Sequence, residues 1–286
     1  MSPTATGTRL RITGSNFSYQ HTTFARFCAD AAELGLRDLE LWGIAPHLQV
    51  DTATAADVAA LRAELDRHGL RVRCLTPEQV VYPVNLASGD EGLRRRSVAL
   101  FRRAADIAAD LGSDLLFLTS GRGYEDEPVE PARARSVRSL REVVAHAAGL
   151  GLECVLEPLQ RRETNLVRTT ADLRAALDDV GEPSLGVALD TVAMACAGEG
   201  VQDYLRAFGV GTGGVRHVHL VDGTPAGHLV PGEGDLPLAD VVAALTAAGY
   251  PGWATFELFG DGGYALDPRP ALERCLEWFR GLDAAA

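Results

Sequence analysis

Residues 153–159 read ECVLEPL, a short apolar run that ends on the acidic side chain of Glu157. Three later segments repeat this arrangement, in which a strand-like run ends on a side chain able to bind a metal: VALDT with Asp190, VHLVD with His219 and TFELF with Glu257. Successive side chains are 33, 29 and 38 residues apart, and each interval is close to the length of one strand, one helix and two loops. The spacing therefore predicts one β/α unit between each side chain and the next.

These four side chains are expected to meet. In a barrel of eight β/α units the carboxyl ends of the strands converge on one mouth, where such barrels carry their chemistry. Two glutamates, one aspartate and one histidine suit Mn²⁺, Mg²⁺ or Co²⁺ better than an ion that prefers thiolates. A single polar strand end is more simply explained by solvation, but four in register predict a catalytic metal site. We expect one divalent ion, Mn²⁺ first, with Mg²⁺, Co²⁺ or Zn²⁺ as alternatives.

Apolar β-type runs alternate with amphipathic stretches along the whole chain, a pattern typical of a parallel sheet with helical crossovers. Strands are predicted at residues 10–14, 38–42, 72–75, 114–119, 153–157, 185–190, 216–221 and 253–258. Helices are predicted at residues 23–34, 55–68, 92–111, 131–150, 170–179, 201–208, 238–248 and 270–282. A doubly wound sheet is the alternative, but its ligand crevice forms at one strand-order switch rather than from four successive strands. The predicted fold is a single (β/α)8 TIM barrel of the α/β class.

The length of 286 residues fits one large barrel or two small domains, and no linker rich in proline, glycine or serine divides the chain. One domain over residues 1–286 is expected, with residues 1–7 as a flexible tail. The hydrophobic content of 47% provides a core, yet no apolar run approaches the length needed to cross a bilayer. The first residues contain no apolar signal-peptide core, so a cytoplasmic location is expected.

The charged residues exclude several classes of function. The net charge is −12, and all 27 basic residues are arginines. The absence of lysine excludes a Schiff-base aldolase, a P-loop nucleotide site and a lysine general base. An acidic chain repels polyanions, so we expect a small-molecule substrate, a sugar or polyhydroxylated ketone, and neither a nucleic-acid nor a membrane partner. Barrels of this kind often associate, which leaves a homo-oligomer open.

The longest informative run is LEPLQRRETNLVRT at residues 156–169. Together with LDT at 189–191, HVHLVD at 217–222 and PGEG at 231–234, it resembles the xylose-isomerase-like sugar phosphate isomerase/epimerase superfamily. Within that superfamily the chain looks closest to the ketose 3-epimerases. The resemblance covers essentially the whole chain and is specific over residues 153–258. It implies a TIM barrel with one divalent ion at its mouth.

The resemblance also implies roles for individual side chains. The metal ligands of the family fall on Glu157, Asp190, His219 and Glu257, the same residues that the spacing selects. In ketose epimerases of this type the two glutamates also form an acid/base pair on opposite faces of the substrate. A cation bound to the carbonyl and its neighbouring hydroxyl stabilises the enediolate that forms. Glu163 matches a family position that contacts substrate hydroxyls, with an exposed loop acid as the alternative.

Two positions depart from the family pattern. Residues 190–193 read DTVA where many members have Asp-x-x-His, so Ala193 stands where a histidine would help to hold the substrate. His228 stands where sugar epimerases have an arginine, and it is expected to orient a hydroxyl or act as acid/base near neutral pH, unless it is an exposed bystander. We also predict that Trp42 stacks on the substrate and that Arg122 grips a phosphate or carboxylate, with packing or a solvated rim as the alternative for each.

The leading hypothesis is an enzyme, a divalent-metal-dependent isomerase or epimerase of a sugar or sugar-like hydroxyketone that acts by glutamate-mediated proton transfer through an enediolate. A metal-dependent lyase or dehydratase of a keto-sugar or cyclitol is the alternative, since loss of a β-leaving group from the same enediolate replaces reprotonation. A non-catalytic barrel that binds a sugar is a third hypothesis, against which the retention of all four ligand-type residues argues. An endonuclease IV-like site is disfavoured because the chain lacks the additional histidines and is acidic.

Overall fold

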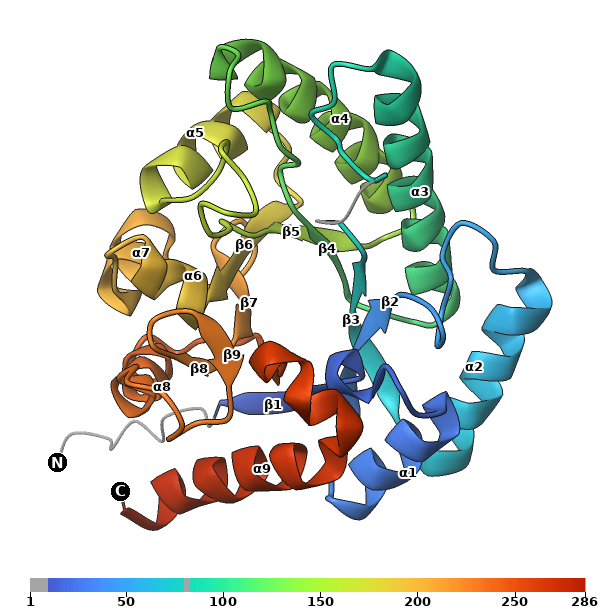
Figure 1. Cartoon of the computed structure of the whole chain (residues 1–286), viewed down its shortest axis with the longest axis vertical. Helices are drawn as coiled ribbons and strands as arrows, with labels where there is room; N and C mark the ends of the chain where they lie inside the picture. Colours follow the sequence, from blue (N-terminus) through green and yellow to red (C-terminus); the bar gives the residue numbers. More distant parts are fainter. Residues whose placement is uncertain (1–9, 80–82, 286) are drawn as a thin grey trace, which may run out of the picture.

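In the part of the chain that the structure describes, eight parallel strands close into a barrel (Figure 1). The structure is a computed structural model, and it describes residues 10–79 and 83–285. Neighbouring strands follow the chain order around the barrel, and the last strand pairs with the first. The strands are β1 (Arg11–Ser15), β2 (Asp38–Gly43), β3 (Arg71–Pro77), β4 (Leu115–Leu118), β5 (Glu153–Leu156), β6 (Leu185–Asp190), β7 (Val215–His219) and β10 (Trp253–Phe256).

Each barrel strand is followed by at least one helix on the outside of the barrel (Figure 1). The helices are α1 (Phe24–Glu33), α2 (Ala55–His68), α3 (Glu91–Asp110), α4 (Val129–Gly149), α5 (Thr170–Val180), α6 (Thr191–Cys196), α7 (Val201–Phe208), α8 (Leu238–Ala247) and α9 (Pro268–Ala285). Short 3₁₀ helices, η1 (Phe17–Tyr19) and η2 (Gly260–Leu266), follow β1 and β10. An antiparallel hairpin of β8 (Asp222–Gly223) and β9 (Gly227–Leu229) is inserted between β7 and α8.

The predicted TIM barrel is confirmed. Every predicted strand and every predicted helix overlaps an element of the structure, with ends that differ by a few residues. The sequence did not predict α6, the β8–β9 hairpin or the 3₁₀ helices, because elements this short show little periodicity. The predicted tail at residues 1–7 lies outside the described residues. Across the described helices, none is long and apolar enough to cross a membrane.

Local sequence signals set the ends of the helices. At the start of α2, the hydroxyl of Thr54 accepts a hydrogen bond from the backbone N–H of Asp57, and the Asp57 carboxylate accepts one from the backbone N–H of Thr54. This capping box satisfies two donors that the helix itself leaves unpaired. The helix ends at Gly69, whose φ of 63° is a left-handed conformation that glycine adopts readily. Asp90 and Thr169 cap α3 and α5 through their side-chain oxygens.

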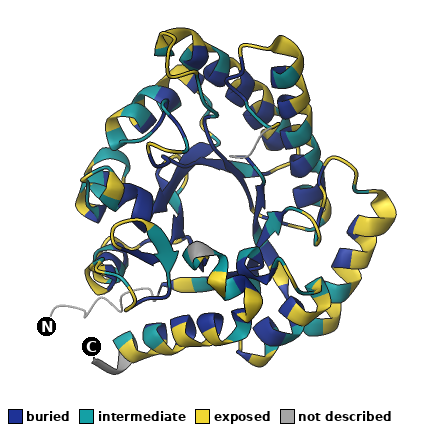
Figure 2. Ribbon diagram, viewed as in Figure 1, coloured by how far each residue is buried: buried dark blue, intermediate teal, exposed yellow. Residues whose placement is uncertain are grey.

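Most residues of the barrel strands are buried (Figure 2). Side chains that point outwards join the large core between barrel and helices, whereas alternate side chains point into the barrel. One side of the interior is apolar and is filled by Cys74, Leu115, Phe117, Val155 and Ala188. The opposite side is polar and includes Thr13, Glu40, His217 and Thr255, all completely buried. The interior therefore has an apolar half on β3 to β6 and a polar half on β1, β2, β7 and β10.

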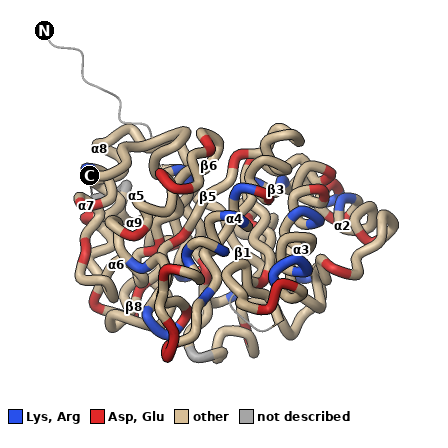
Figure 3. Tube along the Cα trace, turned by 90° about the horizontal axis from the view of Figure 1, so that it is seen from above, with Lys and Arg blue, Asp and Glu red and all other residues tan. Residues whose placement is uncertain are grey.

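Acidic and arginine side chains are interspersed along the trace (Figure 3). Glu91, for example, lies 2.7 Å from Arg94, 3.0 Å from Arg95 and 3.3 Å from Arg138. Surface ion pairs contribute only about 0–1 kcal/mol each, because water screens the charges. The stability of the barrel is therefore expected to depend chiefly on its buried core.

A substitution on α3 tests this expectation. Phe101 is 1% exposed and belongs to the core between barrel and helices. Phe101→Ala should lower the free energy of unfolding by about 3–5 kcal/mol, because the truncation removes apolar contacts and leaves a cavity. Arg102→Ala, at the adjacent exposed position, should change that free energy by less than about 0.5 kcal/mol. Urea unfolding measures both variants, and equal midpoints would contradict the assigned face of the helix.

Candidate active site and metal centre

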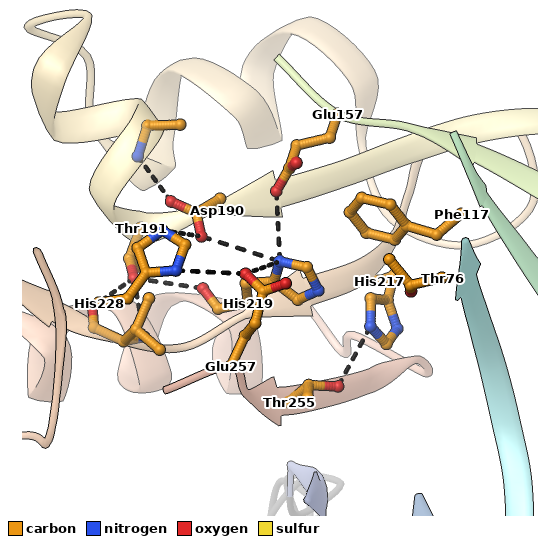
Figure 4. Close-up of polar contacts among 12 residues, drawn as sticks. Thr76, Phe117, Glu157, Asp190, Thr191, His217, His219, His228, Thr255 and Glu257 are labelled. Atoms are coloured by element: carbon orange, nitrogen blue, oxygen red, sulfur yellow. Dashed lines mark hydrogen bonds and ion pairs between the residues drawn. The ribbon is translucent and has the colours of Figure 1, made fainter. Parts of the chain in front are cut away.

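The four strand-end side chains converge at the mouth of the barrel (Figure 4). Nδ1 of His219, at the end of β7, lies 3.2 Å from Oε1 of Glu157 and 3.2 Å from Oε2 of Glu257. The same nitrogen lies 3.8 Å from Oδ2 of Asp190, at the end of β6. All four residues are buried. The carboxyl ends of β5, β6, β7 and β10 thus bring one imidazole and three carboxylates to a common point.

Unpaired atoms at this point fit a divalent cation. Among the described residues, Nδ1 of His219 and Oδ2 of Asp190 are buried and have no hydrogen-bond partner. Buried polar atoms are ordinarily paired, so both atoms call for a further partner. Donor atoms of Glu157, Asp190 and His219 all lie within 4.8 Å of one another. Asp190 and Glu257 also have donor atoms within 4.8 Å of each other. Carboxylates this close repel one another, and a cation between them would remove that repulsion.

Asp190 has two structural functions. It ends β6 and begins α6, and its Oδ1 accepts a hydrogen bond of 2.6 Å from the backbone N–H of Ala193. Its other oxygen, Oδ2, faces His219 and the common point. The helix cap therefore fixes the carboxylate with Oδ2 turned toward the common point. Ala193 lines the cavity with a methyl group at the position where a histidine was expected from the family pattern.

The two glutamates experience different electrostatic surroundings. Burial raises the pKa of Glu157 to about 8, against the lowering effect of His219. Burial also acts on Glu257, but His219 and His228 outweigh it and lower the pKa of Glu257 to about 2. In the protein without a cation, Glu157 therefore holds a proton at neutral pH while Glu257 is ionised. Two carboxyl groups with separated pKa values at one centre are a typical acid/base arrangement.

His228 enters the site from the β8–β9 hairpin. Its Nδ1 lies 3.2 Å from Oε2 of Glu257, and its Nε2 lies 3.6 Å from Oδ2 of Asp190. Its φ of 55° is uncommon for a residue other than glycine. Burial would lower the pKa of His228, but the Asp190 and Glu257 carboxylates outweigh burial and raise it to about 9. The side chain is only 20% exposed, so the exposed-bystander alternative is not what the structure shows.

A cavity of about 390 Å³ opens above the common point. Glu157, His228 and Glu257 form part of its lining, as do the predicted residues Trp42 and Glu163. The remaining lining combines apolar residues with polar and charged ones. The apolar residues are Phe17, Ile44, Pro77, Phe117, Leu159, Ala193, Gly227 and Phe259, and the others are Gln20, Thr76, Glu78, Gln79, Thr119, Gln160 and Arg162. Phe17 packs edge-on against Trp42 at 3.8 Å between ring centroids and stacks on Phe259 at 5.5 Å. One wall of the cavity is therefore aromatic.

Two predicted substrate contacts lie in different surroundings. Glu163 lines the cavity and accepts a hydrogen bond of 3.0 Å from the backbone N–H of Gln160, and burial raises its pKa. Arg122 lines an adjoining cavity, which shares Glu163 and Thr119 with the first. Its guanidinium binds the Glu125 carboxylate at 2.8 Å and the backbone carbonyl of Arg162. The structure thus brings Glu163 to the site and places Arg122 in the adjoining cavity, where its contacts also hold two loops together.

Sequence reasoning missed Glu40. This carboxylate lies on β2, completely buried in the polar half of the barrel, and its oxygens are 3.1 and 3.2 Å from Nε2 of His219. Burial would raise the pKa of Glu40, but His219 and His217 outweigh burial and hold it well below its usual range. The signal in the sequence was the two-residue spacing between Glu40 and Trp42, which places both on the inner face of the strand.

The structure is an α/β barrel whose mouth gathers side chains able to bind a metal, at the place where barrels of this kind carry their active sites. The chain belongs to the xylose isomerase-like TIM-barrel family, whose pattern matches residues 28–282. It is 31% identical to the fructoselysine 3-epimerase of Shigella flexneri, over 88% of this chain and 91% of that protein. It is 29% identical to the L-ribulose 3-epimerase of Methylomonas sp., over 87% and 82% of the two chains. The predicted superfamily is confirmed.

Solved structures show the same fold. The 3-keto-D-glucoside 4-epimerase of E. coli superimposes with a TM-score of 0.79, over 96% of this chain and 100% of that chain. The sequence identity between the two is 19%. At this identity the likeness is one of fold, and it supports the barrel topology rather than a particular substrate.

Proposed function

We propose that the chain is a divalent-metal-dependent sugar epimerase that inverts the carbon next to the carbonyl of a keto-sugar. The convergence of Glu157, Asp190, His219 and Glu257 on one point carries this proposal. The relatives described above are sugar epimerases, which supports an enzyme of the isomerase/epimerase class and favours it over the lyase or dehydratase. Epimerisation and isomerisation of ketoses both begin with removal of the proton beside the carbonyl.

The same four residues are proposed to hold the cation, and Mn²⁺ is the preferred candidate. Ligand sets that are rich in oxygen and contain one imidazole suit hard and borderline ions. Charge stabilisation at the substrate carbonyl is the chemistry that a cation supplies when bound. Glu257, which reaches the centre from the end of β10, is proposed to accept a proton from one face of the substrate. Glu157, which reaches the centre from the end of β5, is proposed to deliver a proton to the opposite face. In the reverse reaction the two exchange roles.

His228 is proposed to bind a substrate oxygen. Both of its ring nitrogens face carboxylates, so the ring is held in place, and it also lines the cavity. A protonated imidazole at this position donates hydrogen bonds, as the arginine of the family pattern would. Glu163 and Trp42 are proposed as further contacts, the first for hydroxyl groups and the second for an apolar substrate face. Arg122, which is held by Glu125 and the Arg162 carbonyl, is not retained in this proposal.

The cavity favours an unphosphorylated substrate with an apolar or amine-bearing substituent. Among the described lining residues Arg162 is the one arginine, and its largely exposed side chain lies 3.5 Å from Glu163. A phosphate ester would therefore lack the cluster of cationic donors that such groups require. The aromatic wall of Phe17, Trp42 and Phe259 offers stacking or cation–π contact instead. One relative is named for fructoselysine, a ketose that carries an amino-acid substituent.

Deuterium incorporation tests the proposed function. With Mn²⁺ present, we expect deuterium from heavy water to enter carbon 3 of a ketose together with formation of its 3-epimer. We expect kcat/KM to be about tenfold higher for fructoselysine than for fructose, a difference of about 1.4 kcal/mol, and to be lowest for fructose 6-phosphate. NMR of the product mixtures measures both quantities. Release of water or another leaving group would instead establish the lyase, and no exchange with any ketose would reject the reaction class.

A further inference from the structure

The hydrogen bonds of Glu40 account for both of its oxygens. Oε1 accepts a hydrogen bond of 2.6 Å from the hydroxyl of Thr76, and Oε2 lies 2.7 Å from Nε2 of His217. Nε2 of His219 lies within 3.2 Å of both oxygens. An ionised carboxylate has no hydrogen to donate, so each ring nitrogen that faces it carries the proton. In a neutral imidazole the other nitrogen then has a free lone pair, and for His219 that nitrogen is Nδ1.

The plane of the His219 ring is fixed from another side. The ring of Phe117, from the apolar half of the barrel, stacks on it with 4.7 Å between centroids and an angle of 8° between planes. Phe117 therefore holds the ring in its plane, while Glu40 determines which edge points into the barrel. The edge that carries Nδ1 is left to face Glu157, Asp190 and Glu257.

We propose that Glu40 is a positioning residue of the metal centre, which fixes the Nε2–H tautomer of His219 and so presents its Nδ1 to the cation. The inference rests on the proposed function, because it assumes that the four mouth residues bind a divalent ion. Carboxylates that accept the second N–H of a ligating histidine orient the ring and increase its basicity. Loss of such a partner ordinarily weakens metal binding about 10–100-fold.

A direct ligand role for Glu40 is the competing explanation. Donor atoms of Glu40, Cys74 and His217 also lie within 4.8 Å of one another, as do those of Glu40, His219 and Glu257. A cation at either place would have to displace the hydrogen bonds that Glu40 makes with Thr76 and His217. Glu40 as a positioning residue predicts one ion per chain, whereas Glu40 as a ligand of a separate site predicts two.

Metal titration of the variants separates these explanations. The dissociation constant for Mn²⁺ is measured on the metal-free full chain by competition with a fluorescent chelator. Glu40→Gln, which retains one acceptor but not the charge, should weaken binding about tenfold, and Glu40→Met, which removes both acceptors, about 100-fold. The matched control is Asp30→Asn, since Asp30 is a buried carboxylate on α1 paired with Arg26 and Arg269. The control should bind Mn²⁺ as the wild type does.

Each outcome has a distinct meaning. Wild-type protein that binds no Mn²⁺ would reject the proposed function itself. Wild-type binding with unchanged affinity in both Glu40 variants would overturn the positioning role and leave the proposed function standing. Two ions in the wild type and one in Glu40→Met would make Glu40 a ligand, which also overturns the proposal.

The tautomer can be read without any change at Glu40. In ¹⁵N NMR spectra of the wild type loaded with Zn²⁺, the ring that responds to the metal and is absent from a His219→Gln sample should carry its proton on Nε2. Addition of Zn²⁺ should shift its Nδ1 resonance, because that atom acquires the bond to the metal. A proton on Nδ1, or a shift confined to Nε2, would overturn the proposal even if the Glu40 variants fail to fold.

Discussion

Turnover of the ketose should fall about 10²–10⁴-fold when either Glu157 or Glu257 is replaced by glutamine, because each variant lacks one of the two groups proposed to move protons. Glutamine keeps the size of the side chain and one oxygen that can contact the cation, so the barrel should remain folded. The assay is run at saturating Mn²⁺ to separate loss of proton transfer from weaker metal binding. Glu273→Gln, at an exposed position on α9, is the control and should turn over like the wild type.

Isotope exchange makes this prediction more specific. A variant with one remaining carboxylate can still remove a proton from the substrate face that this carboxylate reaches, and return a deuteron to the same face. Each variant should therefore exchange hydrogen in one epimer without inverting it, and the two variants should select opposite epimers. Near-normal epimerisation in both variants would reject the assigned roles, and exchange into the same epimer by both would reject the two-face arrangement.

The second large effect is expected on metal content. Protein purified without chelator should hold about one divalent ion per chain, and the double variant Asp190→Ala/His219→Ala should hold none, because it lacks two of the four ligands. Mn²⁺ at about 100 times its dissociation constant should stabilise the wild type by about 2.7 kcal/mol and leave the double variant unchanged. Elemental analysis and thermal unfolding measure these quantities.

A matched variant controls for the loss of any histidine. His21, exposed between η1 and α1, lies outside the cluster, and His21→Ala should retain the ion and the thermal shift. Absence of metal from the wild type after Mn²⁺ has been offered would remove the electrophile from the proposed reaction. A barrel that binds a sugar without turnover would then be the better explanation.

The sequence predicts the positions of four side chains at the barrel mouth because each comes at the end of a strand. These side chains are Glu157, Asp190, His219 and Glu257. Each ends a run of apolar residues, and parallel strands carry their carboxyl ends to the same edge. The type and approximate extent of the barrel strands and the longer helices could be predicted for similar reasons, since helices of ten or more residues and buried strands show clear periodicity.

Glu40 could not be predicted in the same way. Its partners Thr76, His217 and His219 are 36, 177 and 179 residues away in the chain, and only the closed barrel brings them together. The pairing of β2 with β3 also shifts register between Leu39 and Glu40, an irregularity that an alternating pattern does not reveal. The contacts of Glu40 inside the barrel thus depend on the tertiary structure and cannot be read from the local sequence.

The hairpin that carries His228 has its own internal support. The carboxylate of Asp222 accepts hydrogen bonds from the backbone N–H groups of Gly223, Gly232 and Leu236, and the carbonyl of His228 accepts one from the backbone N–H of Phe259. These hydrogen bonds are made by backbone groups and by the Asp222 carboxylate. The His228 imidazole that faces the cavity takes no part in them. The side chain at position 228 can therefore be replaced while the hydrogen bonds that shape residues 222–236, the barrel strands and the proposed metal ligands stay as they are. Laboratory evolution of substrate preference has a natural starting point at this position.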